Sequence, residues 1–271
     1  MGNRSAQREL VIFGRELETV GAAQVDAGFS GDSAADELLE SSPNAFLIGV
    51  LFTQGIPAER AWSGPAALRE RLGTLDLAFL ASNPCAVRAA VQDPPMLHRF
   101  KETLPRWIVS AARRLLDEYA GDASNIWPDG QHVVEVTRRL SQFDGIGRKK
   151  AVMAVEILVR HFGVALSGRE CGSVAYDVHV RRVFLRSGIS DEDTVEAIEA
   201  AALEACPEAP GTLDLAAWLV GREWCRPKSP RCDVCRLGAV CERRVDLCPE
   251  GVGVRKAYSA ERKTRPESSL G

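Results

Sequence analysis

The chain has 271 residues, of which 45% are hydrophobic and 26% are charged, and its formal net charge is −3. These are ordinary globular values, and a chain of this length can bury one large core or two modest ones. No apolar run approaches the ~18 residues of a transmembrane helix, and the N-terminus "MGNRSAQREL" lacks a signal peptide's apolar core. We therefore expect a cytoplasmic monomer without a membrane partner.

Apolar residues recur at helical spacing along most of the chain, whereas the alternating pattern of strands is almost absent. Glycine or proline stands at most of the joints between the apolar stretches. The expected helices, in chain order, are 44–54, 66–82, 99–121, 132–143, 149–163, 193–206 and 212–225. The polar segment 246–271 is expected to be disordered. The sequence therefore predicts an all-α protein.

Charged residues are unevenly distributed. Residues 1–40 carry eight acids against three arginines, whereas residues 222–244 carry seven bases against three acids. A net charge near zero can therefore conceal a basic face, and a local basic face is what binding to a polyanion requires.

The stretch "FDGIGRKKA" (143–151) places two glycines immediately before three cations. Glycines allow a sharp turn, and a helix that begins at Arg148 directs its first N–H groups and the positive end of its dipole toward the same side. This arrangement favours a phosphate seat, although an ordinary turn between helices with exposed basic residues is the alternative. The residues expected to contact phosphate here are Gly145, Ile146, Gly147, Arg148 and Lys150.

Four cysteines form the pattern C-x6-C-x2-C-x5-C within residues 225–241: Cys225, Cys232, Cys235 and Cys241. So short a segment cannot build its own core, but it can fold around a metal centre. Zinc and a 4Fe–4S cluster both accept four thiolates, and a single close pair flanked by two long arms favours the larger cluster. Cys248 lies outside the pattern. Cys85, Cys171 and Cys206 are scattered and are expected to be small buried residues.

Taken together, these segments resemble the endonuclease III-type DNA glycosylases of the helix–hairpin–helix superfamily. The cysteine spacing is similar to the iron–sulfur loop of that family, and "FDGIGRKKA" resembles its hairpin, usually written L-P-G-V-G-R-K-T-A. "YDVHVRRVFLRSG" resembles its V-D-T-H-[VIF]-x-R-V segment, and "FLIGVLFTQ" resembles its L-x-x-x-x-L-S-x-Q helix end. The resemblance extends from about residue 40 to residue 245.

The resemblance assigns two catalytic residues. Lys149 aligns with the nucleophilic lysine, whose amine attacks C1′ of a flipped nucleotide and forms a Schiff base before β-elimination cuts the strand. A surface lysine that grips phosphate is the alternative. Asp177 matches the catalytic aspartate, which stabilises an oxocarbenium-like transition state or assists deprotonation of the amine. Asp177 also suits a helix N-cap, and His179 is expected to be structural.

The resemblance also assigns DNA contacts. Gln54 matches the glutamine that fills the void left by the extruded base, because an amide offers both a donor and an acceptor to the widowed base. Residues 102–107 fall near the intercalating wedge of the family, with Leu104 as the candidate. In the cluster loop the expected phosphate contacts are Arg226, Lys228 and Arg231.

The resemblance implies two helical lobes with a cleft between them. The first lobe, 43–162, would contain the helical bundle and the helix–hairpin–helix at about 132–162. The second would combine 1–42 with 163–245 and hold the cluster loop. Lys149 from one lobe would meet Asp177 from the other, where a flipped base enters.

The function implied is a base-excision DNA glycosylase with lysine-dependent AP lyase activity and a 4Fe–4S cofactor. Its partner would be double-stranded DNA that contains a damaged or modified base, in the cytoplasm and associated with the nucleoid. One alternative is a monofunctional glycosylase for a mismatched or foreign modified base, in repair or in defence against phage. Another is a non-catalytic DNA-binding iron–sulfur protein.

The sequence departs from the family pattern in two places. Asp144 replaces the proline of the hairpin and puts a carboxylate beside the phosphate seat. The segment "VALSGRECGSVA" (164–175) lengthens the interval between Lys149 and Asp177. Because this segment joins the two expected lobes, it leaves the identity of the excised base open.

Overall fold

The computed structural model describes residues 2–20 and 29–245. The regular secondary structure in these ranges is helical apart from one isolated β-bridge between His132 and Ser167. The predicted all-α class is therefore confirmed. The tail 246–271 and Cys248 lie outside the described residues. Within the described ranges, no helix combines the length and apolar character needed to span a membrane. The described residues form two compact units: residues 2–19 with 169–245 make unit 1, and residues 20 and 29–168 make unit 2.

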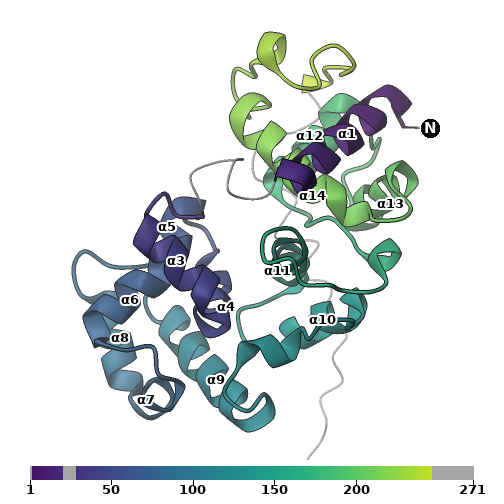
Figure 1. The fold of residues 1–271 in the computed structure, drawn as a ribbon. Coiled ribbons are helices and arrows are strands. Elements are labelled where there is room, and N and C mark those ends of the chain that lie inside the picture. The colour runs from purple at the N-terminus through teal and green to yellow at the C-terminus, as the bar shows by residue number, and fades with distance from the viewer. Residues whose placement is uncertain (1, 21–28, 246–271) are drawn as a thin grey trace, which may run out of the picture. The chain divides into compact units, whose positions relative to one another are not determined.

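Unit 2 is a bundle built around one nearly all-apolar helix, α4, which is labelled with its neighbours in Figure 1. Ser42 caps α4 by accepting a hydrogen bond from the Ala45 amide at 3.2 Å, and every residue from Ala45 to Phe52 is buried. A helix that is apolar on all sides needs neighbours on all sides, and α3, α5, α6 and α9 supply them. The helices of unit 2 are α3 (Ser33–Ser41), α4 (Pro43–Phe52), α5 (Ala58–Trp62), α6 (Gly64–Leu72), α7 (Leu77–Ser82), α8 (Pro84–Gln92), α9 (Thr103–Glu118), η1 (Ala123–Ile126), α10 (Val133–Leu140) and α11 (Arg148–Arg160).

Unit 1 joins the N-terminal helix to the C-terminal third of the chain. Asn3 anchors that helix, because its side-chain amide donates to Ser187 O at 2.9 Å and to Val240 O at 2.7 Å. Arg236 forms ion pairs with Glu9 and Glu16, so acids of the N-terminal region neutralise one base of the cysteine loop. The helices of unit 1 are α1 (Arg4–Val20), η2 (Arg169–Cys171), α12 (Val178–Ser187), α13 (Val195–Ala205), η3 (Pro210–Thr212), α14 (Leu213–Leu219), the π-helical turn η4 (Val220–Trp224) and η5 (Cys232–Val234).

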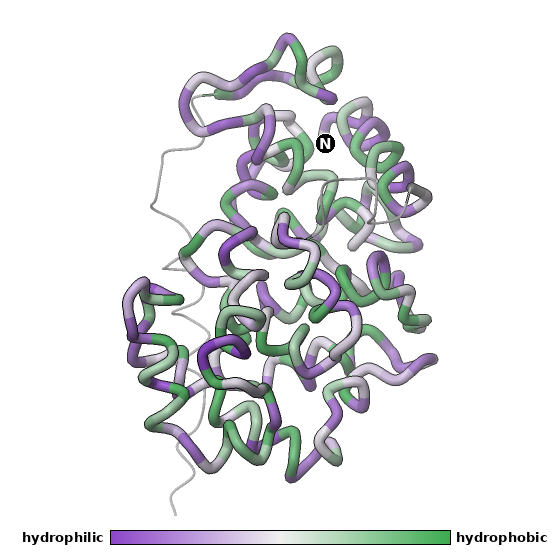
Figure 2. Tube along the Cα trace, turned by 60° about the vertical axis from the view of Figure 1, so that its left-hand side comes forward, coloured by the Kyte–Doolittle hydropathy of each residue, from purple (hydrophilic) through white to green (hydrophobic). Residues whose placement is uncertain are grey.

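A helix lies in each predicted range, with differences in continuity and in coverage. Figure 2 shows hydrophilic and hydrophobic stretches alternating along the helical coils of the described chain. The helix predicted over 66–82 is divided into α6 and α7, because Gly73 ends α6 in the left-handed conformation at φ +75° and Asp76 caps α7. The helices α1, α3, α5, α8 and α12 lie outside the predicted ranges, although Asp177 was expected to cap a helix where α12 begins.

The boundaries of the two units differ from the predicted lobe boundaries. The first boundary falls between residues 19 and 20 instead of 42 and 43, and the second falls between 168 and 169 instead of 162 and 163. The helix α3 belongs to unit 2 because its Leu39 is fully buried in the core of that unit and the helix packs on α4 and α6. Residues 164–168 belong to unit 2 because they pair with the start of the hairpin helix α10, where Val133 N donates to Ser167 O at 2.9 Å and Ser167 N donates to Gln131 O at 3.0 Å.

Candidate functional site

A helix–hairpin–helix connects α10 to α11. The turn is closed by backbone hydrogen bonds from Phe143 N to Leu140 O at 3.1 Å and from Ile146 N to Phe143 O at 3.0 Å. Phe143 and Ile146 are both buried, so the turn is fastened to the core of unit 2 by two apolar side chains. The Ile146 amide is thereby used inside the turn. It follows that an anion at this hairpin would be met by amides of the first helical turn of α11, which have no acceptor within the helix.

The two glycines of the hairpin have different roles. Gly145 adopts φ +84°, and a Cβ there would lie 2.4 Å from the Trp107 ring of α9. Gly147 is the N-cap of α11 with φ −86°, and a Cβ there would meet nothing within 4 Å. Gly145 is therefore required by the turn and by the close approach of Trp107, whereas Gly147 faces open space at the start of a helix.

The three cations that follow the hairpin lie in different environments. Arg148 is exposed, and Lys149 is half-buried in the first turn of α11. Lys150 is 7% exposed, and its Nζ donates to Leu51 O at 2.8 Å and lies 5.5 Å from the centre of the Trp107 ring. The expected phosphate contact of Lys150 does not agree with this geometry, because the ammonium points into unit 2 and is already bound to a carbonyl oxygen.

Burial lowers the pKa of Lys150 from 10.5 to about 7, with a further contribution from the charge of Lys149. A buried amine loses its proton more readily because the charged form is poorly solvated. The amine perturbed in this way is the one next to the position that aligns with the family nucleophile.

Asp144, which departs from the family pattern, has a partner in α9. The Ser110 hydroxyl donates to Asp144 Oδ2 at 2.8 Å, so the carboxylate ties the turn to that helix. Asp144 remains exposed, and its charge stays beside the start of α11. The residue thus has a structural use that the sequence did not reveal.

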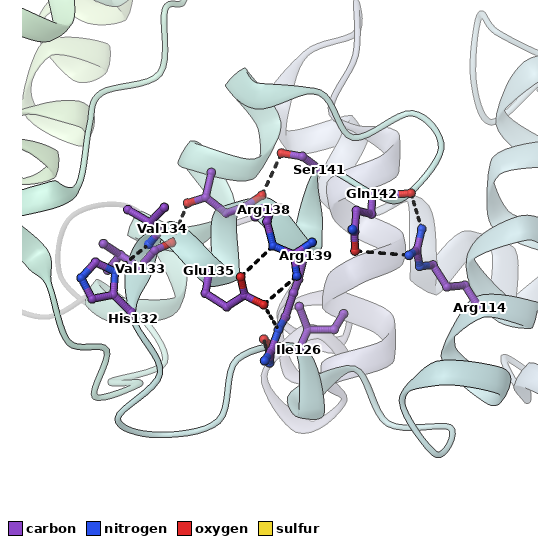
Figure 3. A network of polar contacts seen from close by, with 11 residues as sticks. Arg114, Ile126, His132, Val133, Val134, Glu135, Arg138, Arg139, Ser141 and Gln142 are labelled. Carbon is purple, nitrogen blue, oxygen red and sulfur yellow. Dashed lines mark hydrogen bonds and ion pairs between the residues drawn. The ribbon is translucent and has the colours of Figure 1, made fainter. Parts of the chain in front are cut away.

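The first helix of the hairpin carries its own charge network, shown in Figure 3. Glu135 accepts from Arg138 at 2.7 Å and from Arg139 at 2.9 Å. Hydrogen bonds from Arg138 and then Arg139 lower the pKa of Glu135 to about 2. From α9, Arg114 reaches the turn and donates to the Gln142 side-chain oxygen at 3.2 Å (Figure 3). Glu135 therefore stays ionised and offsets the two arginines, so α10 adds less positive charge than its sequence suggests.

Gln54 lies just beyond the end of α4 and is exposed. Its backbone amide donates to Phe52 O at 2.7 Å, and the same oxygen accepts from His98 Nε2 at 3.1 Å. The Phe100 amide donates to His98 Nδ1 at 3.0 Å, so Nε2 carries the proton of a neutral ring. Burial lowers the pKa of His98, which agrees with that neutral form. Two side chains from distant parts of the chain, His98 and Lys150, thus bind adjacent carbonyls at the end of α4.

Leu104 does not fit the role of an intercalating wedge. The side chain is fully buried near the start of α9 and belongs to the apolar core of unit 2. A wedge has to be exposed so that it can enter a base stack, and Leu104 could reach DNA only if α9 left the core.

Asp177 is the N-cap of α12, and its Oδ1 accepts from the His179 amide at 2.7 Å. The backbone before it is held in place, because the Ala175 amide donates to the buried Asp214 at 2.7 Å and the Tyr176 hydroxyl donates to Asp193 at 2.9 Å. Asp177 itself is 8% exposed. A carboxylate fixed in this way at a helix start is pre-organised, which suits electrostatic catalysis.

The four pattern cysteines are all half-buried and lie on one loop of unit 1. Burial raises the pKa of Cys235, and the neighbouring thiolates of Cys225, Cys241 and Cys232 raise it further, so the four sulfurs lie within electrostatic reach of one another. The loop is tightly wrapped, since a Cβ on Gly238 would lie 2.4 Å from Cys232 O. Of the three remaining described cysteines, Cys206 is buried as expected, but Cys85 and Cys171 are exposed.

Two buried arginines of α12 fasten the first arm of this loop. Arg182 donates to Cys225 O at 2.6 Å and to Gly221 O at 2.7 Å. Arg186 donates to Arg226 O at 2.7 Å and to Pro227 O at 3.0 Å. Neither arginine was among the residues predicted from the sequence. The expected phosphate contacts Arg226, Lys228 and Arg231 are all exposed on the same loop.

A helical bundle with a buried central helix, a hairpin that leads into a basic helix start, and a C-terminal four-cysteine loop define a class. Comparisons with known proteins show where this fold is found. No protein-family model matches the chain.

Similar proteins include endonuclease III of Buchnera aphidicola subsp. Baizongia pistaciae (strain Bp), which is 27% identical over 137 residues. The match spans 50% of this chain and 54% of that protein, so the chain matches about half the length of this relative.

Solved structures are similar over more of the chain. A trapped endonuclease III–DNA covalent intermediate has a TM-score of 0.57 at 21% identity and covers 79% of this chain and 95% of its own. A non-covalent endonuclease III–DNA complex also has a TM-score of 0.57 at 21% identity, with 78% and 93% covered. A thermostable thymine-DNA glycosylase has a TM-score of 0.60 at 12% identity, with 91% and 98% covered. The chain therefore has the fold of these DNA glycosylases.

Proposed function

We propose that this protein is a base-excision DNA glycosylase that extrudes a damaged or modified base from duplex DNA and removes it. The observation that carries the proposal is the hairpin with its open Gly147 at the start of α11, followed at once by Lys149. A similar fold is found in endonuclease III trapped covalently on DNA. The combination supports a helix start that receives a phosphate beside an amine that reacts.

In the proposed mechanism the DNA backbone is seated first. The amides at the start of α11 and the exposed Arg148 bind a phosphate near the target nucleotide. Gln54, exposed beyond the end of α4, enters the space left by the extruded base and hydrogen-bonds the widowed partner. Because these contacts involve backbone phosphate and an unpaired base, they position the nucleotide without specifying the lesion.

Lys149 then acts as the nucleophile and Asp177 as its partner. The Lys149 amine attacks C1′, the C1′–N bond to the base breaks, and the base leaves with a proton. Asp177 stabilises the positive charge that develops on the sugar. The C1′–O4′ bond then breaks and O4′ takes up a proton, which gives the protonated Schiff base. The Schiff base loses a proton from C2′, and the bond from C3′ to its phosphate oxygen breaks, which nicks the strand. Lysine-dependent AP lyase activity follows from this sequence of steps.

The cysteine loop fits a 4Fe–4S cluster by its donor set. Four half-buried thiols lie on one loop that contributes a single core side chain, Leu237, so the loop needs another source of stability. A bound cluster would supply the thiolate bonds that hold this loop together. Arg226, Lys228 and Arg231 are then fixed on the surface, where they can contact phosphates. Equal amounts of iron and acid-labile sulfide would identify the cluster, whereas zinc without sulfide would contradict it.

The experiment that tests the function is reductive trapping. Borohydride should link the wild-type protein covalently to a duplex with one abasic site, and Lys149→Ala should abolish the adduct. The matched control is Lys101→Ala, because Lys101 is an exposed lysine of the same unit. Trapping that survives Lys149→Ala would contradict the assignment of the nucleophile.

Base release scored separately from nicking tests the rest of the proposal. A panel of duplexes, each with one defined lesion, should reveal the excised base. Free base without strand cleavage would indicate a monofunctional glycosylase for a mismatched or foreign base. Duplex binding without release of any base, unchanged in Asp177→Asn, would indicate a non-catalytic DNA-binding protein.

A further inference from the structure

Lys150 is the most unusual charged side chain of the hairpin. A lysine normally keeps its ammonium in water and buries only its stem. Here the whole side chain is 7% exposed, and its Nζ donates to Leu51 O at 2.8 Å. Burying a charged group costs free energy, and the hydrogen bond to Leu51 O offsets part of that cost. An apolar side chain in the same place could not donate this bond.

The acceptor of this bond lies at a helix end. Leu51 is one of the last residues of α4, and the last four carbonyls of a helix have no partner within it. Thr53 Oγ1 donates to Val50 O at 2.7 Å, and His98 Nε2 lies 3.1 Å from Phe52 O. Lys150 satisfies the carbonyl between them, and it is the only one of these three donors that comes from the hairpin helix.

The ring beside Lys150 is Trp107 of α9, which also packs against the hairpin turn. The Trp107 ring lies 5.5 Å from Lys150 Nζ and packs against the Gly145 backbone, where no Cβ would fit. An ammonium beside an aromatic ring gains a favourable cation–π interaction. One lysine therefore connects the turn, the start of α11 and the end of α4 through contacts made entirely within unit 2.

We propose that Lys150 is a positioning residue that clamps the end of α4 to the first turn of α11 and so sets Gln54 at a fixed place relative to Lys149. This role rests on the proposed function, because Gln54 and Lys149 matter together only when a base is extruded between them. As a positioning residue, Lys150 itself touches no DNA. It acts by holding the backbone immediately before Gln54.

The clamp can be tested without DNA by hydrogen–deuterium exchange. In Lys150→Met, peptides that cover residues 51–56 should exchange faster by about tenfold, the factor expected when a hydrogen bond from a charged donor is lost. Lys101→Met, which removes an exposed lysine of the same unit, should leave this exchange unchanged. Unchanged exchange in Lys150→Met would overturn the clamp. If Lys150→Met does not fold, the exchange of the same peptides is measured in Lys150→Gln, whose side chain is shorter but still carries a donor.

The link to Gln54 is tested by a double-mutant cycle on affinity for abasic-site duplex. Lys150→Met and Gln54→Ala should each weaken binding, and the double variant should bind no worse than Gln54→Ala alone. Additive losses would overturn the action through Gln54. A borohydride adduct that is lost in Lys150→Met but kept in Lys149→Ala would make Lys150 the nucleophile and overturn its role as a clamp.

Failure of the proposed function and failure of the Lys150 clamp can be told apart. If the wild-type protein neither binds nor traps abasic DNA, the proposed function fails, and the exchange experiment still decides whether Lys150 holds the end of α4.

Discussion

The buried amine of Lys150 predicts a stability that depends on pH in an unusual direction. The perturbation is Lys150→Met, which keeps a long side chain in the site and removes the ionisable group. In the folded protein burial lowers the pKa of Lys150 from 10.5 to about 7. In the unfolded chain the same amine keeps its ordinary pKa. The wild type and the variant should therefore differ in how their stability changes with pH.

The sign and size follow from proton linkage. Between the two pKa values the unfolded state binds more protons than the folded state, so the folded state gains stability as the pH rises. Below the pKa that Lys150 has in the folded state, the full free-energy cost of burying the charge lowers the stability. This cost decreases progressively as the pH rises to the pKa of the unfolded chain. At about 1.36 kcal/mol per pKa unit, the wild type should gain roughly 2 kcal/mol over Lys150→Met between about pH 7 and about pH 9.

Other groups near the amine do not reverse this sign. Lys149 adds to the lowering of the Lys150 pKa, and the charge of Lys150 in turn contributes to the lowered pKa of His98. The His98 ring is neutral in the folded state, so it does not titrate across the alkaline range in question.

The assay is denaturant unfolding of the wild type, Lys150→Met and Lys101→Met at several pH values across this range. The free energy of unfolding of the wild type should rise relative to Lys150→Met, while Lys101→Met should follow the wild type because its ammonium is solvated in both states. Parallel curves for the wild type and Lys150→Met would refute the reasoning, since they would mean that the amine titrates alike in the folded and unfolded chains.

Three further predictions concern the same unit. Gly145→Ala should lower the free energy of unfolding, measured with denaturant, by at least about 1–3 kcal/mol, because its backbone is left-handed and Trp107 leaves no space for a Cβ. The free energy of unfolding of Gly147→Ala should lie within about 0.5 kcal/mol of that of the wild type. The same variant should bind duplex DNA more weakly. Asp144→Asn should bind duplex DNA more tightly at low salt, by less than about tenfold, and an advantage that persists at high salt would contradict a charge effect. Leu104→Ala should lower the free energy of unfolding by about 2–5 kcal/mol, whereas a wedge residue would leave it unchanged.

Much of the fold could be predicted because helical periodicity is a local property. The apolar run that becomes α4 and the hairpin that leads into α11 are both visible in the spacing of residues along the sequence. The break between α6 and α7 was missed because the apolar spacing continues across Gly73, and only the left-handed cap at that residue ends the helix. The Asp177 cap was predictable because a short acceptor before an apolar run suits a helix start.

The orientation of long side chains could not be predicted. A lysine in the first turn of a helix reaches solvent or the interior equally well, and only the position of the Leu51 carbonyl decides for Lys150. Trp107 and His98 were missed for a related reason: each acts on a segment far away in the chain, and neither carries a local motif. The use of Asp144 likewise depends on Ser110, a partner 34 positions away.

The anchoring of α1 has a consequence for how the chain is made. Its partners, Ser187, Val240 and Arg236, all follow unit 2 in the sequence, so a ribosome releases α1 before unit 2 and the docking sites of α1 after it. At ~5–20 residues per second, translation leaves α1 without its partners for on the order of tens of seconds, while unit 2 emerges complete and can fold. Leu10, fully buried in the finished protein, is exposed through that interval. The burial of Leu10 therefore waits for the C-terminal part of unit 1, whereas unit 2 can complete its own core before that part is made.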